Sequence, residues 1–250
     1  MIINVYYTLI SFSSSTAMNL ASSRPPITAP LEVINDTAAE TAKTAAKKSR
    51  LLVAGAVVWL LIISGGSTFM LEYSEAPGSA GTVPATWPTD SAISPVSGYG
   101  TLMLFVHPHC PCSRATIGEL ELLMAHTQGK MAAHVWFLRP EGMTEEWVKT
   151  DLWQSAAAIP GVQVHVDEAG REANHFHAET SGQAVLYDGA GHLTFQGGIT
   201  VARGHAGDNA GRSAVTAMMT QGLVGSVKTP VFGCALSGSE CQQGGAACIQ

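Results

Sequence analysis

Positive charge is scarce in this chain of 250 residues, which holds 13 Lys and Arg against 19 Asp and Glu and has a formal net charge of −6. No stripe of lysine or arginine follows the chain beyond residue 50. Proteins that bind nucleic acid need such basic surfaces, because they neutralise backbone phosphates. The composition therefore predicts no nucleic acid partner.

Other common sequence features are missing as well. The glycine-rich segment 197–211 lacks the lysine and the spacing of a Walker phosphate loop. No internal repeat is found along the sequence. The opening residues MIINVYYTLISF lack the positively charged start of a secretory signal, and we hypothesise that translation begins at Met18. The distribution of residue types instead favours one globular domain with appended segments.

An uncharged stretch at residues 51–71 follows an N-terminal segment rich in Ser, Thr, Ala and Pro. We expect residues 1–50 to be disordered. Residues 51–71 are predicted to form a transmembrane helix, because about 1.5 Å per residue then spans a hydrocarbon core of about 30 Å. A buried core helix and a cleaved signal peptide are the alternatives. Basic residues precede the stretch and acidic residues follow it, which predicts a cytoplasmic N-terminus and a main domain in the periplasm, where disulfides persist.

Strand-like and helix-like segments alternate over residues 98–224, after a linker at 72–97 that is rich in Pro, Gly and Ser and is expected to act as a tether. Strands are predicted at 101–107, 133–138, 162–166, 184–187 and 192–196, and helices at 113–128, 144–157, 168–178 and 208–221. The sequence Asp188-Gly189-Ala190-Gly191 favours a hairpin turn between the last two strands. This order predicts a three-layer α/β domain whose sheet is partly parallel and ends in an antiparallel hairpin.

A turn with two cysteines joins the first predicted strand to the first helix of the domain. It reads FVHPHCPCSR, with Cys110 and Cys112 on either side of Pro111. A thiol at a helix N-terminus beside an arginine lies in an electric field that favours the thiolate, which is the nucleophilic and metal-binding form of sulfur. The chemistry of this protein is therefore expected at the Cys-Pro-Cys turn.

The strand that leads into FVHPHCPCSR, the helix after it and the late hairpin AVLYDGAGHLTF together resemble the thioredoxin superfamily. The HPHCPCS turn, with the later GGIT and RGHAGDNAG, is similar to membrane-tethered bacterial chains called RedB-like. The resemblance covers residues 98–224. It implies a thioredoxin-like three-layer α/β/α domain with a mixed sheet. It also implies thiol-disulfide exchange with protein partners of the cell envelope, without a cofactor.

The resemblance implies roles for the residues of the turn. Cys110 takes the position of the family's nucleophile, and Cys112 is expected to resolve the mixed disulfide. Ser113 stands where the family's second cysteine would be, so the usual spacing of two residues between the cysteines is absent. A disulfide between residues i and i+2 closes a small ring away from the preferred disulfide geometry, and such a bond should be strained and easily reduced.

Several other residues are expected to support this chemistry. Ser113 can hydrogen-bond the thiolate, and Arg114 or the helix N-terminus can stabilise its charge. Gly182 stands where the family carries a cis-proline, and glycine accepts unusual dihedral angles without enforcing a cis bond. The remaining expected residues are His109 beside the turn, and Arg203 and His205 in the glycine-rich loop, which lies near the active-site groove in thioredoxin-like folds. The alternative for this loop is an ordinary connection in which Asp208 or Asn209 caps the last helix.

Two other functions fit the turn. His107, His109, Cys110 and Cys112 form a His-x-His-Cys-x-Cys cluster that suits copper or zinc, so a metal-binding or metal-transfer module is the alternative. Alternate positions of a strand point to opposite faces, and two sulfurs with one histidine are therefore easier to assemble than all four ligands. The third possibility is a buried cysteine pair in a catalytically inactive interaction domain.

The C-terminal tail, residues 225–250, holds the other three cysteines, Cys234, Cys241 and Cys248. A local disulfide between Cys241 and Cys248 would leave Cys234 free to reach the Cys-Pro-Cys turn. The alternative is a frayed terminus with solvent-facing thiols. The sequence leaves both possibilities open.

Overall fold

The computed structural model describes residues 31–223 and 225–236. The chain divides into two compact units, Met1–Ile62 and Ile63–Gln250, and each is described by itself. The predictions on residues 1–30, and those on Cys241 and Cys248, lie outside the described residues.

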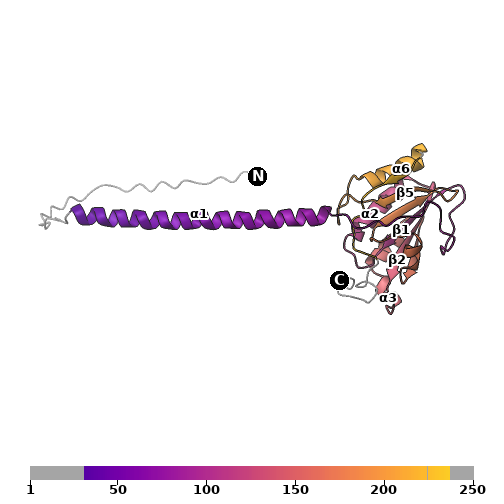
Figure 1. Cartoon of the computed structure of the whole chain (residues 1–250), viewed down its shortest axis with the longest axis horizontal. Helices are drawn as coiled ribbons and strands as arrows, with labels where there is room; N and C mark the ends of the chain where they lie inside the picture. The colour runs from indigo at the N-terminus through magenta and orange to yellow at the C-terminus, as the bar shows by residue number, and fades with distance from the viewer. Residues whose placement is uncertain (1–30, 224, 237–250) are drawn as a thin grey trace, which may run out of the picture. The chain divides into compact units, whose positions relative to one another are not determined.

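A single long helix, α1 (Leu31–Glu75), precedes the domain (Figure 1). Its part from Ala39 to Glu75 is long and apolar enough to cross a membrane, by length and composition. The predicted span 51–71 lies inside this helix. Residues 31–50, which we predicted to be disordered, are helical instead. Their alanine, glutamate and lysine residues favour a helix, and adding turns to a helix already formed avoids the cost of a new nucleus.

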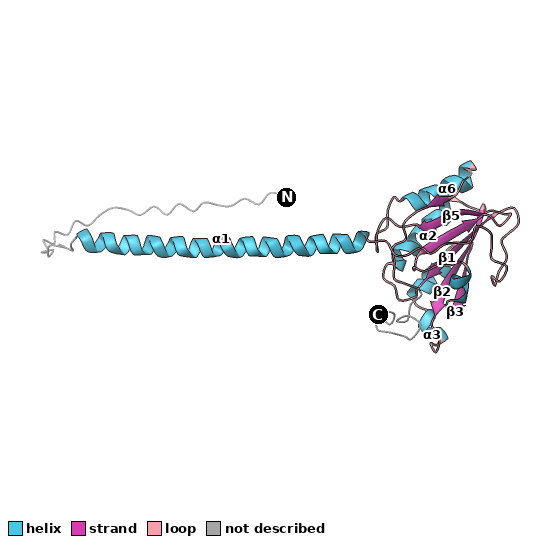
Figure 2. Ribbon diagram, viewed as in Figure 1, coloured by secondary structure: helices cyan, strands magenta, loops and turns pink. Residues whose placement is uncertain are grey.

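The second unit is built on one six-stranded sheet in the order β3-β2-β1-β4-β5-β6. Figure 2 shows the strands in magenta, with β5, β1, β2 and β3 labelled. The strands are β1 (Gly100–Val106), β2 (Met131–Arg139), β3 (Val162–Glu168), β4 (Gln183–Tyr187), β5 (Leu193–Gly198) and β6 (Val227–Lys228). β1, β2 and β3 run parallel, β4 is antiparallel to both β1 and β5, and β6 is parallel to β5. β1 and β4 are buried along their whole length, because both faces of the sheet are covered.

Helices cover both faces of this sheet. They are α2 (Ser113–His126), α3 (Glu145–Val148), α4 (Asp151–Ala157), α5 (Arg171–His175) and α6 (Ala210–Gln221). Apolar residues of α2, α4 and α6 pack with Leu102 and Leu104 of β1 in one core. The alternate β1 residues Met103 and Phe105 face a second core with α5 and Phe176. The arrangement is the predicted three-layer α/β/α domain with a mixed sheet.

Two of the predicted helices differ from the observed ones. The helix predicted at 144–157 is interrupted between α3 and α4, because Lys149 has a non-helical ψ of 58° and Thr150 is extended. The helix predicted at 168–178 is shorter, since β3 continues to Glu168 and Gly170 adopts a left-handed conformation before α5 begins. The hairpin turn after β4 is confirmed, and the backbone N–H of Gly191 donates to the carbonyl of Asp188 (2.9 Å).

The linker does not act as a free tether over most of its length. Trp87 packs edge-on against Phe176 and Tyr187, with ring centroids 5.1 Å apart in each pair. The hydroxyl of Tyr187 donates a hydrogen bond to the carbonyl of Pro84 (2.8 Å). The reason is geometric: α5 has only five residues, so it leaves apolar sheet surface that the linker buries.

Residues 229–236, which we call the strap, also belong to the domain rather than to a frayed tail. Val231 and Leu236 are buried. The backbone N–H of Gly198 donates to the carbonyl of Pro230 (3.1 Å), and Val231 forms an antiparallel bridge with Gly78. The strap therefore binds the domain through both main-chain pairing and apolar burial.

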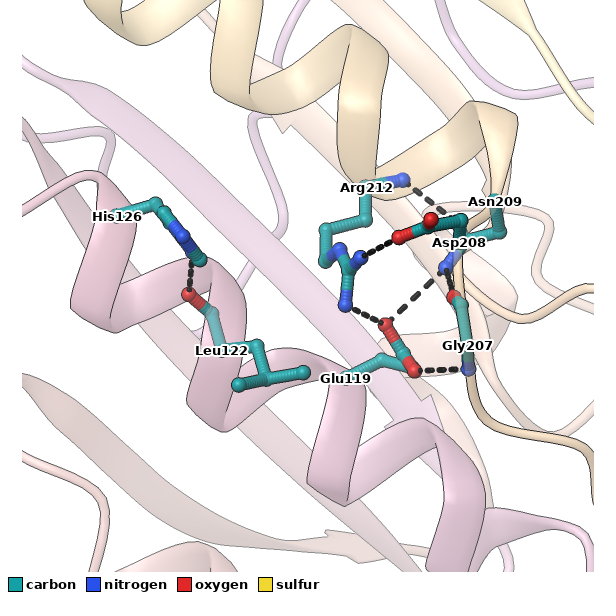
Figure 3. A network of polar contacts seen from close by, with 7 residues as sticks. All are labelled: Glu119, Leu122, His126, Gly207, Asp208, Asn209 and Arg212. Carbon is teal, nitrogen blue, oxygen red and sulfur yellow. Dashed lines mark hydrogen bonds and ion pairs between the residues drawn. The ribbon is translucent and has the colours of Figure 1, made fainter.

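A buried ion pair fixes the loop between β5 and α6 (Figure 3). Glu119 of α2 is 1% exposed, and its carboxylate accepts hydrogen bonds from Arg212 Nη1 (2.6 Å), from the Gly207 backbone (2.7 Å) and from Asn209 Nδ2 (3.1 Å). Asn209 Oδ1 accepts from the backbone N–H of Arg212 (2.7 Å), so Asn209 is the predicted cap of α6. This network ties the glycine-rich loop to the helix that begins at the Cys-Pro-Cys turn.

Candidate active site

The Cys-Pro-Cys turn consists of two successive tight turns between β1 and α2. The backbone N–H of Cys110 donates to the carbonyl of His107 (3.1 Å), and that of Ser113 donates to the carbonyl of Cys110 (3.0 Å). Pro108 and Pro111 each occupy the second position of a turn, where their fixed φ is favourable. The local sequence thereby places Cys110 at the junction of the strand and the helix.

The side chains of Cys112 and Cys234 both hydrogen-bond Cys110 at this junction. Cys110 is 1% exposed, while Cys112 and Cys234 are half-buried, and all three are free cysteines. Hydrogen bonds from Cys112, then from the side chain of Cys234, hold the pKa of Cys110 far below its ordinary value, although burial acts in the opposite direction. The same hydrogen bonds, together with burial, raise the pKa of Cys112 and of Cys234. In this arrangement the thiols of Cys112 and Cys234 can both donate hydrogen bonds to an ionised Cys110 sulfur.

A pair of serines lies beside the thiolate. Ser113 hydrogen-bonds Cys110 and adds to the lowering of its pKa, after the contributions of Cys112 and Cys234. The Ser113 hydroxyl is 2.8 Å from that of Ser181, and the Ser181 hydroxyl accepts from the backbone N–H of His107 (2.8 Å). The Ser113 hydroxyl therefore lies within hydrogen-bonding reach of the Cys110 sulfur, and its role in the chemistry remains a prediction. Ser181 was not predicted, and its only signal in the sequence is its place beside Gly182.

Gly182 directly precedes β4, the strand that pairs with β1. Its φ is +91°, and its backbone N–H donates to the carbonyl of Phe105 (2.7 Å). Over the residues that the structure describes, no peptide bond is cis. A Cβ added at Gly182 would lie 3.1 Å from Thr116 Oγ1, in a conformation that other residues rarely adopt. Glycine thus meets a requirement for a positive φ at this position, whereas a cis-proline would supply a cis peptide bond.

Arg203 approaches the thiols from the glycine-rich loop. Its guanidinium donates to the carbonyls of Ala76 and Gly233, and it lies over the ring of Tyr73. Hydrogen bonding to Cys110 is the main cause of the raised pKa values of Cys112 and Cys234, and the positive charge of Arg203 opposes it. Arg203 therefore lies near the thiols, and its role at the site remains a prediction. His205 is exposed and contacts the carbonyl of Arg203 (2.8 Å).

Arg114 has a different partner from the one we expected. Its guanidinium forms an ion pair with Asp151 (2.5 Å), and both side chains are largely exposed. The groups that lower the pKa of Cys110 most are Cys112 and Cys234. Arg114 points to the start of α4 because the Asp151 carboxylate offers it a partner in solvent.

The two histidines of the turn pack on Trp147. His109 Nε2 lies 2.9 Å from the carbonyl of Trp147, and the two rings are 4.5 Å apart. His107 is buried, which lowers its pKa, and its Nδ1 accepts from the backbone N–H of His109 (3.2 Å). Among the described residues, no three His, Cys, Asp or Glu side chains gather so that they could hold a metal ion. The ligand set of the alternative metal-binding function, His107, His109, Cys110 and Cys112, is therefore not assembled in the described part of the chain.

Comparisons with known proteins give no family and no curated protein that matches this chain. Among solved structures, it is similar to an uncharacterized conserved protein from Geobacillus kaustophilus, with 15% identity, 66% of this chain and 93% of that chain covered, and a TM-score of 0.47. A hypothetical protein from Sinorhizobium meliloti 1021 gives 18% identity, 66% and 97% coverage, and a TM-score of 0.47. The pneumococcal exposed lipoprotein thioredoxin Etrx1 from Streptococcus pneumoniae gives 14% identity, 50% and 86% coverage, and a TM-score of 0.36.

The fold itself is thioredoxin-like. The sheet order places β1 between a parallel β2 and an antiparallel β4, with α2 and α6 on one face and α5 on the other. The fold predicted from the sequence is thereby confirmed. The RedB-like subtype remains a prediction.

Proposed function

We propose that this domain performs thiol-disulfide exchange on protein partners, with Cys110 as the attacking thiolate. The observation that carries the proposal is the donation of hydrogen bonds from Cys112 and Cys234 to Cys110, which holds the pKa of Cys110 far below its ordinary value. A thiolate is the reactive form in exchange with a disulfide. Ser113 adds a third hydrogen bond to the same sulfur.

The exchange proceeds in two displacements. The Cys110 thiolate attacks one sulfur of a partner disulfide, and the other partner sulfur leaves as a thiolate that takes up a proton. A second thiol of this chain then loses its proton and attacks the Cys110 sulfur, which releases the first partner sulfur. Two electrons pass from the two thiols of this chain to the partner disulfide. The reverse sequence oxidises two partner thiols.

The same proposal places the domain outside the cytoplasm on a membrane anchor. α1 has the length and composition to cross a membrane. Basic residues precede its apolar part and acidic residues follow it, which favours a cytoplasmic N-terminus and a periplasmic domain. The expected partners are thiol or disulfide proteins of the cell envelope, as in a membrane-tethered, RedB-like chain.

Turnover of a disulfide-bonded model peptide by the full chain in detergent, with dithiothreitol as the reductant, tests the exchange. Cys110→Ser should lower the rate at least about a hundredfold, because it removes the nucleophile. Glu121→Gln, an exposed change on α2, is the matched control and should retain the rate. An unchanged rate in Cys110→Ser would instead favour the inactive interaction domain.

A further inference from the structure

We propose that Cys234 is the resolving thiol of this exchange and that the strap is the arm that presents it to Cys110. This inference rests on the proposed function and names the second thiol that the reaction requires. Cys112 then acts as the hydrogen-bond donor that keeps Cys110 ionised. The inference rests on the contact between the strap and the Cys-Pro-Cys turn. The sequence alone did not determine whether Cys234 reaches this turn.

Main-chain pairing fixes the position of Cys234 on both sides. The backbone N–H of Ser181 donates to the carbonyl of Cys234 (2.8 Å), and the backbone N–H of Leu236 donates to the carbonyl of Glu179 (2.8 Å). Thr180 and Ala235 form an antiparallel bridge between these bonds. The strap therefore adds to the segment before β4 as an extended strand does, and its thiol is directed by the backbone.

Close approach at Gly233 makes this docking specific. A Cβ at Gly233 would lie 1.9 Å from the carbonyl oxygen of Ser181, so a residue with a side chain would push the strap away. Arg203 donates to the carbonyl of Gly233. Leu236 anchors the other end by entering the core on the α5 side of the sheet. These contacts hold the strap beside the turn, where Cys234 hydrogen-bonds Cys110.

The alternative partner, Cys112, is poorly placed to form a disulfide with Cys110. Its backbone is already helical at the start of α2, with φ −67° and ψ −28°. A bond across Pro111 would close a small ring, and the preferred separation of the two Cα atoms in a disulfide leaves little freedom for such a ring. Cys234 comes from a separate segment and carries no such ring constraint.

The strap also controls access to the buried Cys110. Cys110 is 1% exposed, and Cys234 hydrogen-bonds its sulfur in the folded domain. A partner disulfide must displace Cys234 before Cys110 can attack it. When Cys234 returns, its thiol gives up a proton, bonds to the Cys110 sulfur and releases the partner sulfur, which takes a proton. Cys234 thus first gives way to the partner disulfide and then resolves the mixed disulfide on Cys110.

Glutathione disulfide is the probe for the test. The reduced full chain in detergent is oxidised with it, alkylated and digested, and the disulfides are mapped by mass spectrometry without reduction. We expect a Cys110–Cys234 link in the natural chain and in Cys112→Ser. In Cys234→Ser we expect at least about tenfold more glutathione bound to Cys110, because the intramolecular displacement is lost. Cys241→Ser is the matched control and should behave as the natural chain.

A second pair of variants tests the strap without touching a thiol. Gly233→Ala should lower the yield of the Cys110–Cys234 link at least about tenfold, because it separates the two segments. Gly118→Ala is the control, since an added Cβ there meets nothing within 4 Å. An unchanged yield of the Cys110–Cys234 link in Gly233→Ala would contradict the proposed role of the strap.

Two results would overturn the inference, and they are distinguishable. A Cys110–Cys112 link with Cys234 alkylated, while turnover of the peptide still depends on Cys110, removes Cys234 from the reaction and leaves the proposed function intact. An absence of any glutathione or disulfide on Cys110 in every variant removes the nucleophile and with it the proposed function as well.

Discussion

The acidity of Cys110 comes from neighbouring thiols, with no adjacent cation as its main cause. Its principal hydrogen-bond donors are Cys112 and Cys234, while Arg114 is paired with Asp151. A thiolate that depends on donors loses its low pKa when a donor is removed, even where the fold is retained.

Removal of the Cys112 thiol tests this cause. Cys112→Ala should raise the pKa of Cys110 toward its ordinary value, because the largest contribution to the shift is lost. Cys112→Ser keeps a hydroxyl donor and should raise the pKa less. The measurement is the pH dependence of thiolate absorbance, with Cys110→Ser as the baseline. Equal pKa values of Cys110 in Cys112→Ala and Cys112→Ser would contradict a role for a hydrogen-bond donor at position 112.

His134 makes the stability depend on pH. Burial, and then the nearby His165, lower the pKa of His134 to about 4. The ordinary pKa is 6.5, so the unfolded chain takes up a proton first as the pH falls, and stability is lost between about pH 6.5 and pH 4.

His134→Gln should therefore weaken the loss of stability between neutral and acid pH. On acidification to about pH 5, the lowered pKa of His134 reduces the free energy of unfolding of the natural chain by about 2 kcal/mol. The variant lacks this group and should not show that part of the loss. Urea unfolding at both pH values measures this difference. His126→Gln on the exposed side of α2 is the control (Figure 3), and a variant with the same pH dependence as the natural chain would disprove the assignment.

At the scale of elements, the linker behaves as part of the core. Trp87→Ala should lower the free energy of unfolding by about 2 kcal/mol, because a half-buried aromatic packed on Phe176 and Tyr187 is lost. Tyr99→Ala, which truncates an aromatic residue that is 51% exposed, is the control. Chemical denaturation compares the two variants. A linker that is only a tether would give no loss in either.

The loop before α6 depends on one buried carboxylate. Glu119→Ala should lower the free energy of unfolding by about 3 kcal/mol or more, because it leaves the half-buried Arg212 without its buried partner. Glu121→Gln on the exposed face of the same helix should be close to neutral. Urea unfolding distinguishes them, and similar small losses in both variants would show that the network is not a structural element of the loop.

At the scale of the whole molecule, the proposed anchor predicts which side of the membrane each segment occupies. Trypsin added to spheroplasts should leave the bonds after Lys48 and Arg50 intact, because the positive-inside tendency keeps this basic cluster in the cytoplasm. The same bonds should be cut once detergent opens the membrane. Peptide mass spectrometry reads out the cleavage, and cutting after Arg50 in intact spheroplasts would refute the orientation.

Local patterns explain most of what could be predicted. The apolar run of β1, the two turn prolines and the period of α2 are contiguous in sequence, so they place Cys110 at a strand-helix junction without any knowledge of distant segments. The same holds for the hairpin at Asp188 and for the cap at Asn209. The helices at 144–157 and 168–178 differ from the predicted ones, since Lys149 and Gly170 interrupt periodic segments through their backbone conformations.

The sequence by itself therefore determined the thioredoxin-like fold and the place of Cys110 at a strand-helix junction. Only the tertiary structure decided which groups surround Cys110. Ser181, Arg203 and Cys234 come from three other segments, and they meet because β4 pairs with β1, the loop before α6 is tied to Glu119, and the strap pairs with residues 179–181. Such contacts form where distant elements leave apolar surface uncovered and backbone groups unpaired. The local periodicity of the sequence does not show where these surfaces and groups lie.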